Sequence, residues 1–76
     1  MKDKEIYTGV VVKFSNKKNF GFIEWFINNV KQPDMFVHYS DIDIEGYRTL
    51  SVGQTVYFKI DKNNEGRPKA TNVIVI

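Results

Sequence analysis

Aromatic residues stand at alternate positions in two short segments of the chain. Phe20 and Phe22 flank Gly21, and Phe36 and His38 are likewise two residues apart. In a β-strand, side chains two residues apart point to the same face, so each pair would present its rings side by side. Rings held at a surface stack on unpaired nucleobases, and neighbouring cations pair with phosphates. The lysines close by in the sequence are Lys13, Lys17 and Lys18.

The segment around Gly21 is apolar on both faces of a strand. Phe20 and Phe22 would share one face, whereas Ile23 and Trp25 would lie on the other. A small barrel has one interior, so one of these rows lies outside. Because Gly21 lets the backbone curve closely against the interior, we expect Phe20 and Phe22 on the outer surface. Taken alone, Phe-Gly-Phe also fits a buried strand, because aromatic residues are common core components.

The chain offers few groups for catalysis or metal binding. It has no cysteine and a single histidine, His38. This excludes a thiolate zinc site, a disulfide and a cysteine nucleophile, and it leaves His38 without partners for a metal site or a hydrolase relay. The acidic residues Asp41, Asp43 and Glu45 lack the length and ligand number of a calcium loop. We therefore expect no enzymatic activity, no metal and no cofactor.

The composition is typical of a β-rich globular domain. The 76 residues carry a formal net charge of +2, with 42% hydrophobic and 26% charged residues. Val, Ile and Thr together number 21, against one Ala and one Leu, which favours strands. A chain this short has room for one core, so we expect one domain over residues 1–76. The apolar runs are far shorter than the roughly 18 residues of a membrane span, and the polar start is no signal peptide, so we expect a cytoplasmic protein without membrane contact.

Five strand-like segments alternate with turn sequences. They cover residues 7–14, 20–27, 35–39, 55–60 and 70–76, and a polar loop is expected over residues 61–69. In the fourth segment, Val56, Phe58 and Ile60 alternate with more polar residues and are expected in the core. Ser40 is expected to cap one helical turn over residues 41–43. Because five short strands could not cover a core as a flat sheet, we expect an all-β, closed or nearly closed barrel.

Two motifs resemble those of a known family. Residues 18–23, Lys-Asn-Phe-Gly-Phe-Ile, and residues 35–39, Met-Phe-Val-His-Tyr, are similar to the first and second ribonucleoprotein motifs of the cold-shock domain. The similarity continues through residues 40–42, 46–50, 52–54, 56–58 and 68–73, and so spans about residues 9–73. The resemblance implies a five-stranded antiparallel OB-type barrel that binds single-stranded RNA and DNA without catalysis. It also implies a role as an RNA chaperone or as a regulator of transcription or translation.

The resemblance implies roles for individual residues as well. Phe14 matches an aromatic residue at the edge of the stacking surface, and Lys18 matches a lysine that faces phosphates. The rings expected to stack on bases are those of Phe20, Phe22, Phe36, His38, Tyr39 and Tyr47.

The chain departs from the family pattern at the end of the first strand. Val12, Lys13 and Phe14 stand where the family usually has Lys-Trp-Phe, so the strongest stacking ring is absent and Lys13 supplies a charge instead. With each stacked base worth about 1–3 kcal/mol, losing one ring would weaken binding roughly tenfold to a hundredfold. Asn19 replaces a motif glycine, which suits a turn that needs a left-handed residue.

The segment between the two motifs is long, with 12 residues from Glu24 to Met35. We expect the second strand to extend and to place Phe26 in line with Phe20 and Phe22 as a substitute ring. Trp25 would then lie on the inner face or cover the end of the barrel.

A second basic group lies towards the C-terminus, where Asp61 and Glu65 partly offset its charge. The resemblance places this loop at the border of the binding surface. The residues expected to contact phosphates there are Lys59, Arg67 and Lys69, and a role in solubility alone is the alternative.

The leading interpretation is a monomeric protein that binds single-stranded RNA or DNA. The alternative is a barrel that serves as a protein-interaction or assembly module with weakened nucleic-acid affinity. Val10 and Val12 stand where outward lysines are common, and Ile74 and Ile76 could form an apolar edge for a homodimer.

Overall fold

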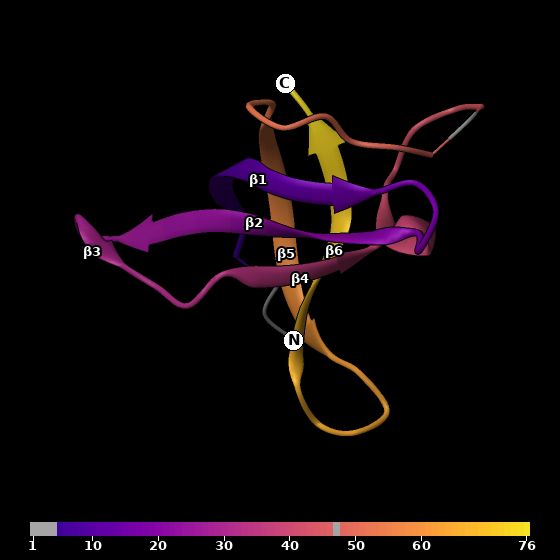
Figure 1. Ribbon diagram of the computed structural model, residues 1–76. Coiled ribbons are helices and arrows are strands. Elements are labelled where there is room, and N and C mark those ends of the chain that lie inside the picture. The colour runs from indigo at the N-terminus through magenta and orange to yellow at the C-terminus, as the bar shows by residue number, and fades with distance from the viewer. Residues whose placement is uncertain (1–4, 47) are drawn as a thin grey trace.

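The computed structural model describes residues 5–46 and 48–76, which form antiparallel strands and one short 3₁₀ turn (Figure 1). The elements are β1 (Tyr7–Ser15), β2 (Phe20–Ile27), β3 (Val30–Lys31), β4 (Met35–His38), η1 (Tyr39–Asp41), β5 (Thr55–Lys62) and β6 (Pro68–Val75). The five expected strands are therefore present, and the all-β prediction is confirmed. The two-residue strand β3 was not expected from the sequence.

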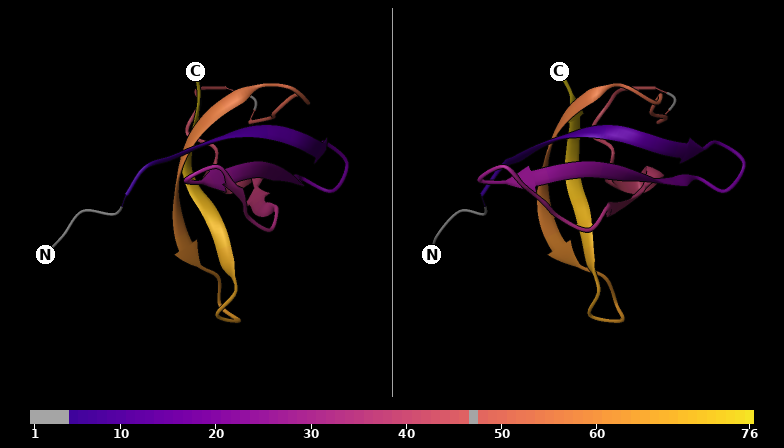
Figure 2. Two further views of the ribbon diagram at one scale, coloured as in Figure 1. Left: turned by 90° about the vertical axis from the view of Figure 1, so that its left-hand side faces the viewer. Right: turned by 60° about the vertical axis from the view of Figure 1, so that its left-hand side comes forward.

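The sheet is built around β2. β1 pairs with β2, and β3 and β4 pair with successive parts of β2 on the side away from β1. β1 also pairs with β5, which pairs with β6, and Figure 2 shows the β5–β6 hairpin crossing the layer of β1 and β2. The curved sheet closes where Ile42 bridges Val73 and the Asp43 N–H donates to the Val73 carbonyl at 2.7 Å. This arrangement is the expected OB-type barrel.

Alternate residues of the strands form the core inside this barrel. Trp25 is 6% exposed and packs on Tyr7 and Phe58, with ring centroids 5.1 and 5.7 Å away. Its indole N–H donates to the Pro33 carbonyl at 2.9 Å, so the predicted inward position of Trp25 is confirmed. Ile60 packs against the core but is only partly buried. The buried residues are Val11, Ile23, Trp25, Met35, Val37, Ile42, Leu50, Val56, Phe58, Ala70 and Val73.

An extra residue in β1 changes which side chains share a face with β2. Val11 lies opposite Ile23, but Lys13 lies opposite Phe22, so Val12 is inserted as a β-bulge. Residues directly opposite each other in antiparallel strands point to the same face. Lys13 therefore lies on the outer face together with Phe22.

Gly21 allows a close approach of β1 and β2 next to this bulge. A Cβ atom on Gly21 would overlap the carbonyl oxygen of Lys13 and would lie 2.7 Å from the Cα of Phe14. Both obstacles are backbone atoms, which cannot rotate away as a flexible side chain can. Only glycine fits at this position without moving β1.

Two local predictions are wrong. The helical turn is η1, which begins at Tyr39 rather than at residue 41, because His38 rather than Ser40 is its N-cap. The loop expected over residues 61–69 is shorter, since β5 continues to Lys62 and β6 begins at Pro68. Residues 61 and 62 pair with residues 69 and 68 across the β5–β6 hairpin. Polar residues that the sequence pattern assigned to a loop therefore belong to the ends of these two strands.

Candidate nucleic-acid interface

Three phenylalanine rings meet on the outer face of β2 and β4. Phe22 lies opposite Phe36 in the ladder, and Phe20 lies opposite His38. The ring centroids of Phe20, Phe22 and Phe36 are 5.5 to 6.2 Å apart, in tilted and edge-to-face arrangements that aromatic pairs prefer. These three side chains, here called the ring cluster, are half-buried. Part of each ring therefore remains open to a ligand.

The inner face of the same two strands holds the ring cluster in position. Ile23 and Val37 are fully buried, and the alternation of side chains along a strand then directs Phe22 and Phe36 outward. Apolar rings gathered on the outside of a small barrel are typical of a surface that binds a partner or ligand. The structure thus places Phe20 and Phe22 on the outer face, as the sequence predicted.

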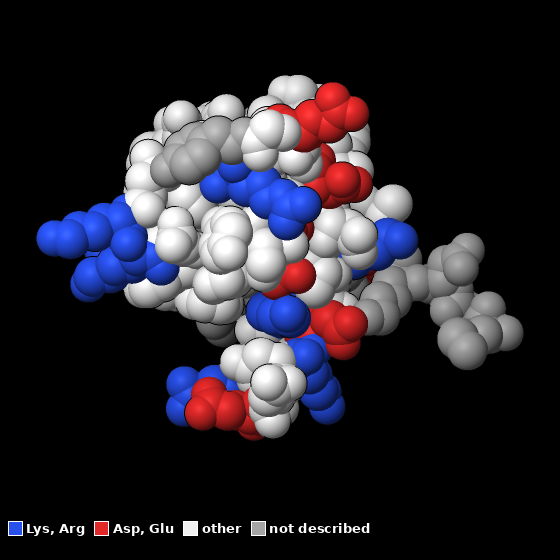
Figure 3. Space-filling model, turned by 90° about the vertical axis from the view of Figure 1, so that its right-hand side faces the viewer, with Lys and Arg blue, Asp and Glu red and all other residues white. Residues whose placement is uncertain are grey.

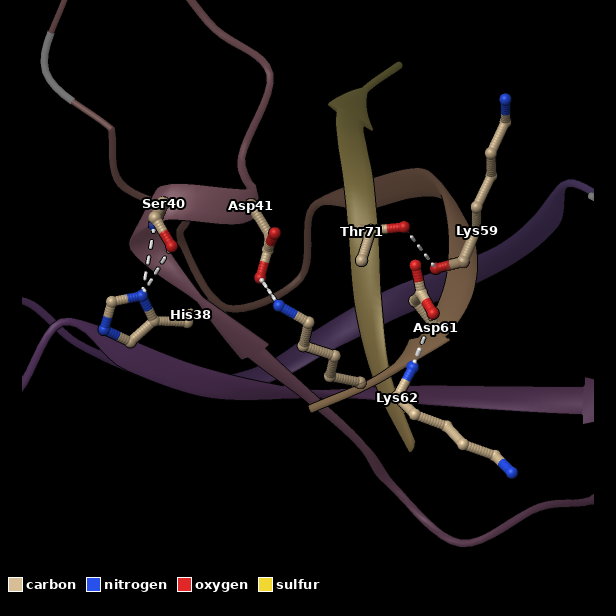
Figure 4. Close-up of polar contacts among 8 residues, drawn as sticks. His38, Ser40, Asp41, Lys59, Asp61, Lys62 and Thr71 are labelled. Carbon is tan, nitrogen blue, oxygen red and sulfur yellow. Dashed lines mark hydrogen bonds and ion pairs between the residues drawn. The ribbon is translucent and has the colours of Figure 1, made fainter. Parts of the chain in front are cut away.

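His38 and Tyr39 extend this surface beyond the ring cluster. Their ring centroids are 4.8 Å apart, and Tyr39 is 41% exposed. The Nδ1 atom of His38 accepts the backbone N–H of Ser40 at 3.4 Å and lies 2.8 Å from the Ser40 hydroxyl oxygen (Figure 4). These contacts hold the imidazole ring of His38 next to η1.

Lys13, near the end of β1, and Lys18, in the β1–β2 turn, border the ring cluster. The Ser15 Oγ accepts the Lys18 N–H at 3.1 Å, and the Ser15 carbonyl accepts the Asn19 N–H at 2.7 Å, which closes the turn. Asn19 has a φ of 64°, so the expected left-handed residue is present. A hollow of about 150 Å³, here called the Gly21 hollow, is lined by Lys13, Ser15, Lys18, Phe20, Gly21 and Phe22.

Arg67 lies at another border of the ring cluster. Together with Phe22 and Phe36 it lines a hollow of about 360 Å³. The conformation of its loop depends on Asn63, whose Oδ1 accepts the N–H of Glu65 at 2.9 Å and that of Arg67 at 3.0 Å. Asn63 was not predicted from the sequence, although an Asn before a Gly-containing polar stretch is a common turn signal.

Arg48 is a further cation at this surface that was not predicted from the sequence. It lines a hollow of about 310 Å³ with Asn19, Tyr39 and Gly46. A signal was present, because residues 46–50 belong to the stretch that resembles the family. The predicted stacking residue Tyr47 lies outside the described residues.

The structure does not bring Lys59 or Lys69 to the ring cluster. The Lys69 Nζ lies 3.2 Å from the Asp41 Oδ2, and these side chains are only 27% and 18% exposed, so Asp41 compensates the charge of Lys69. Lys59 instead lines a hollow with Tyr57 and Ile74, a cross-strand pair of β5 and β6. A phosphate contact by either lysine stays a prediction.

Phe14 and Phe26 also lie outside the ring cluster. Phe14 packs against the core. Phe26 shares the outer face of β2 and is 51% exposed, but no ring contact joins it to another described residue. Between Phe26 and Phe22 along the strand lies Glu24, whose carboxylate is 3.2 Å from the Lys31 Nζ.

The described residues offer this surface rings and cations. Figure 3 shows Lys and Arg side chains together at one edge of the molecule, while the β5–β6 loop at the bottom carries both signs of charge. Within residues 5–46 and 48–76, no cluster of three or more His, Cys, Asp or Glu side chains could hold a metal ion. In the same part of the chain, no helix is long and apolar enough to cross a membrane.

Comparison with known proteins identifies relatives along almost the whole chain. Residues 7–76 match the family described as the 'Cold-shock' DNA-binding domain. The chain is 48% identical over 67 residues to the major cold shock protein CspA of Bacillus cereus, which covers 88% of this chain and 92% of that protein. It is 41% identical over 70 residues to a cold shock-like protein of Aquifex aeolicus, with coverage of 92% and 94%. It is also 42% identical over 66 residues to the cold shock protein ScoF of Streptomyces coelicolor, with coverage of 87% and 92%.

These matches agree with the structure. The barrel has the expected antiparallel strands, and the two motifs that carry the resemblance lie side by side on β2 and β4. Proteins of this family bind single-stranded nucleic acids and are not enzymes, which confirms the prediction of a binding function rather than a catalytic one. The chain belongs to the cold-shock domain family.

Proposed function

We propose that the protein binds single-stranded RNA or DNA by stacking bases on the ring cluster, His38 and Tyr39, while Lys13, Lys18 and Arg67 pair with phosphates. The observation that carries this proposal is the ring cluster itself. The centroids of its half-buried rings are 5.5 to 6.2 Å apart, and the rings help to line two hollows, one shared with Lys13 and Lys18 and the other with Arg67. Stacking on such rings is worth about 1–3 kcal/mol per base and tolerates different bases, because every base has a π-face.

Binding of this kind favours the open form of a nucleic-acid strand. Bases that are stacked on the protein cannot pair with each other, so binding shifts a folded strand towards its open form by mass action. No nucleoside triphosphate is required for this shift. The protein would therefore act as an RNA chaperone, or as a regulator of transcription or translation where the opened strand is a control segment.

Fluorescence anisotropy of labelled heptathymidine and heptauridine, at low and at physiological salt, tests the proposal. The wild-type protein is expected to bind with a Kd of about 1 µM or lower, a free energy of about −8 kcal/mol. The Phe20→Ala/Phe36→Ala double variant removes two rings and should bind at least about 30-fold more weakly, because two stacked bases account for about 2 kcal/mol or more. Tyr57→Ala is the matched control, because Tyr57 is 44% exposed but lies on β5, apart from the ring cluster.

Trp25 supplies the folding control for these variants. It is buried against Tyr7 and Phe58, so its emission reports the integrity of the barrel rather than stacking of a base. A folded wild-type protein that binds neither oligonucleotide would contradict the proposal. That result would favour the protein-interaction module, with the exposed Ile6 and Ile74 as its candidate surface and concentration-dependent association as its signature.

A further inference from the structure

We propose that the β5–β6 loop selects guanine at one position of the bound strand, with the Glu65 carboxylate accepting hydrogen bonds from the edge of that base. The site is the hollow of about 360 Å³ beside the ring cluster, here called the Glu65 hollow. This inference rests on the proposed single-strand binding and adds a base preference that stacking alone does not supply. The residues that line the hollow are Phe22, Phe36, Asn63, Glu65, Arg67 and Pro68.

Aromatic rings and a carboxylate meet in the Glu65 hollow. Phe22 and Phe36 lie opposite each other on β2 and β4, with ring centroids 6.0 Å apart, and Glu65 belongs to the loop that borders them. The volume of about 360 Å³ falls within the range of small-molecule pockets, about 300–1,000 Å³. A base stacked on either ring would therefore have its edge close to the loop.

The carboxylate of Glu65 is free to accept hydrogen bonds from a ligand. It is exposed, and it makes no ion pair and no side-chain hydrogen bond with another described residue. A carboxylate repels phosphate, so it disfavours the backbone of a strand and favours the donor groups of a base. The Gly21 hollow and the hollow beside Arg48 have no carboxylate among the described residues that line them. Glu65 therefore distinguishes this part of the interface from the rest.

Hydrogen bonds within the loop hold the backbone at Glu65 in place. The Asn63 N–H donates to the Arg67 carbonyl at 2.8 Å, and the Gly66 N–H donates to the Asn63 carbonyl at 3.0 Å. The Asn63 Oδ1 accepts the N–H groups of Glu65 and Arg67 at 2.9 and 3.0 Å. Because the loop is ordered by these bonds, less conformational entropy is lost when the carboxylate contacts a base.

Guanine matches these groups better than the other bases. Its Watson–Crick edge presents two neighbouring donors, N1–H and the N2 amino group, which pair with the two oxygens of one carboxylate. The same edge of adenine, cytosine, thymine or uracil places an acceptor next to its donor, and that acceptor would face the carboxylate. The guanine edge also carries the acceptor O6. Because the Asn63 Oδ1 already accepts two backbone N–H groups, the Asn63 amide nitrogen would donate to O6.

A set of heptathymidines, each with one guanosine at a different position, tests the preference by fluorescence anisotropy. The wild type should bind the strand with guanosine at the favoured position about fivefold to tenfold more tightly than heptathymidine, the lower range for one bidentate base contact. Inosine at that position lacks the N2 amino group, so the gain should fall to about twofold to threefold. Because the strands carry equal numbers of phosphates, the ratio of their affinities should be the same at low and at physiological salt.

Glu65→Gln keeps the size of the side chain and replaces one acceptor oxygen by a donor. It should lower the preference for guanosine to less than about twofold, while the affinity for heptathymidine stays equal or rises by up to about threefold, because a negative charge is lost. Asp43→Asn is the matched control, since Asp43 is also exposed but does not line the Glu65 hollow, and this variant should keep the preference. A preference that persists in Glu65→Gln would overturn the proposal.

The same strands separate this inference from the proposed function. If the wild type binds heptathymidine and guanosine is preferred at no position, the inference fails and the proposed function stands. If the wild type binds none of the heptamers, the proposed function fails, and a titration with the nucleosides guanosine and inosine that follows the amide chemical shifts of Glu65 and Gly66 still decides the subsite. Saturable shifts with guanosine that are weaker with inosine and vanish in Glu65→Gln support it. Absence of such shifts in the wild type overturns it.

Discussion

Phe26 provides a test of how far the binding surface extends along β2. It is exposed on the same face as Phe22, four residues further along the strand. At about 3.3 Å per residue the two positions are about 13 Å apart, which equals about four spacings of bases stacked at about 3.4 Å. Glu24 lies between them along the strand, and its carboxylate pairs with Lys31, which lies opposite Phe26. A strand of about four nucleotides on the ring cluster would therefore not reach Phe26, whereas a strand of about ten would.

Phe26→Ala is expected to affect long strands only. Its affinity for tetrathymidine should stay within about twofold of the wild type, and its affinity for decathymidine should fall about fivefold, the value for one stacked base at about 1 kcal/mol. Phe36→Ala should weaken binding of both strands, because Phe36 belongs to the ring cluster. Val30→Ala is the control for the hairpin, since Val30 is 62% exposed and lies opposite Ile27 rather than Phe26.

Anisotropy titrations with thymidine strands of increasing length, all at one salt concentration, measure this difference. An equal loss on short and long strands would refute the spacing argument and place Phe26 in the same site as Phe36. Unchanged binding of decathymidine would remove Phe26 from the interface. Thermal unfolding of Phe26→Ala should match the wild type, because the side chain is 51% exposed and contributes little buried area.

Three further predictions concern stability and ionisation. Gly21→Ala should lower stability by about 1–3 kcal/mol in urea unfolding, because its Cβ would overlap the carbonyl of the paired strand; wild-type stability would contradict the close approach. Asp41→Asn should lower the free energy of unfolding by about 1 kcal/mol, or Tm by about 4–8 °C, because it removes the ion pair with Lys69. A double-mutant cycle with Lys69→Met should assign this loss to the ion pair. The Tyr7 hydroxyl bonds to the Glu5 carboxylate, and this bond, burial and the negative charge raise the pKa of Tyr7 above its usual value of 10.0. The resulting stabilisation of the folded state is fully present below pH 10 and is lost as the pH rises through the raised pKa of Tyr7. Glu5→Gln should lower this pKa towards its usual value, and a titration of the phenolate absorbance measures the change.

The faces of β2 and β4 could be predicted from the sequence because both strands are regular. Apolar residues at alternate positions can face only one interior, so the inward Ile23 and Val37 imply the outward Phe22 and Phe36. The left-handed turn at Asn19 could also be predicted from the sequence, because asparagine is one of the few residues other than glycine that adopt this conformation.

The positions of two lysines could not be predicted in this way. The bulge at Val12 decides the face of Lys13, and it depends on the pairing of β1 with β2 rather than on any local preference of the residues involved. Lys69 is compensated by Asp41, which is 28 residues away in the sequence, so its partner becomes visible only when the barrel closes. Sequence spacing describes a strand well, but it does not reveal which distant charges meet.

The barrel separates the two parts of the proposed interface. The ring cluster lies on β2 and β4, directly behind the buried Ile23 and Val37, so a change in core packing would move the rings relative to each other. The cations are Lys13 near the end of β1, Lys18 in the β1–β2 turn and Arg67 in the β5–β6 loop, and all three side chains are exposed and outside the core. Stacking is therefore tied to the fold, whereas charge at the border is free to vary. Lys13 stands where the family pattern has a ring, and it adds to the charge at the border of the interface. This protein should therefore bind single strands with more dependence on salt and less on stacking than the family pattern implies.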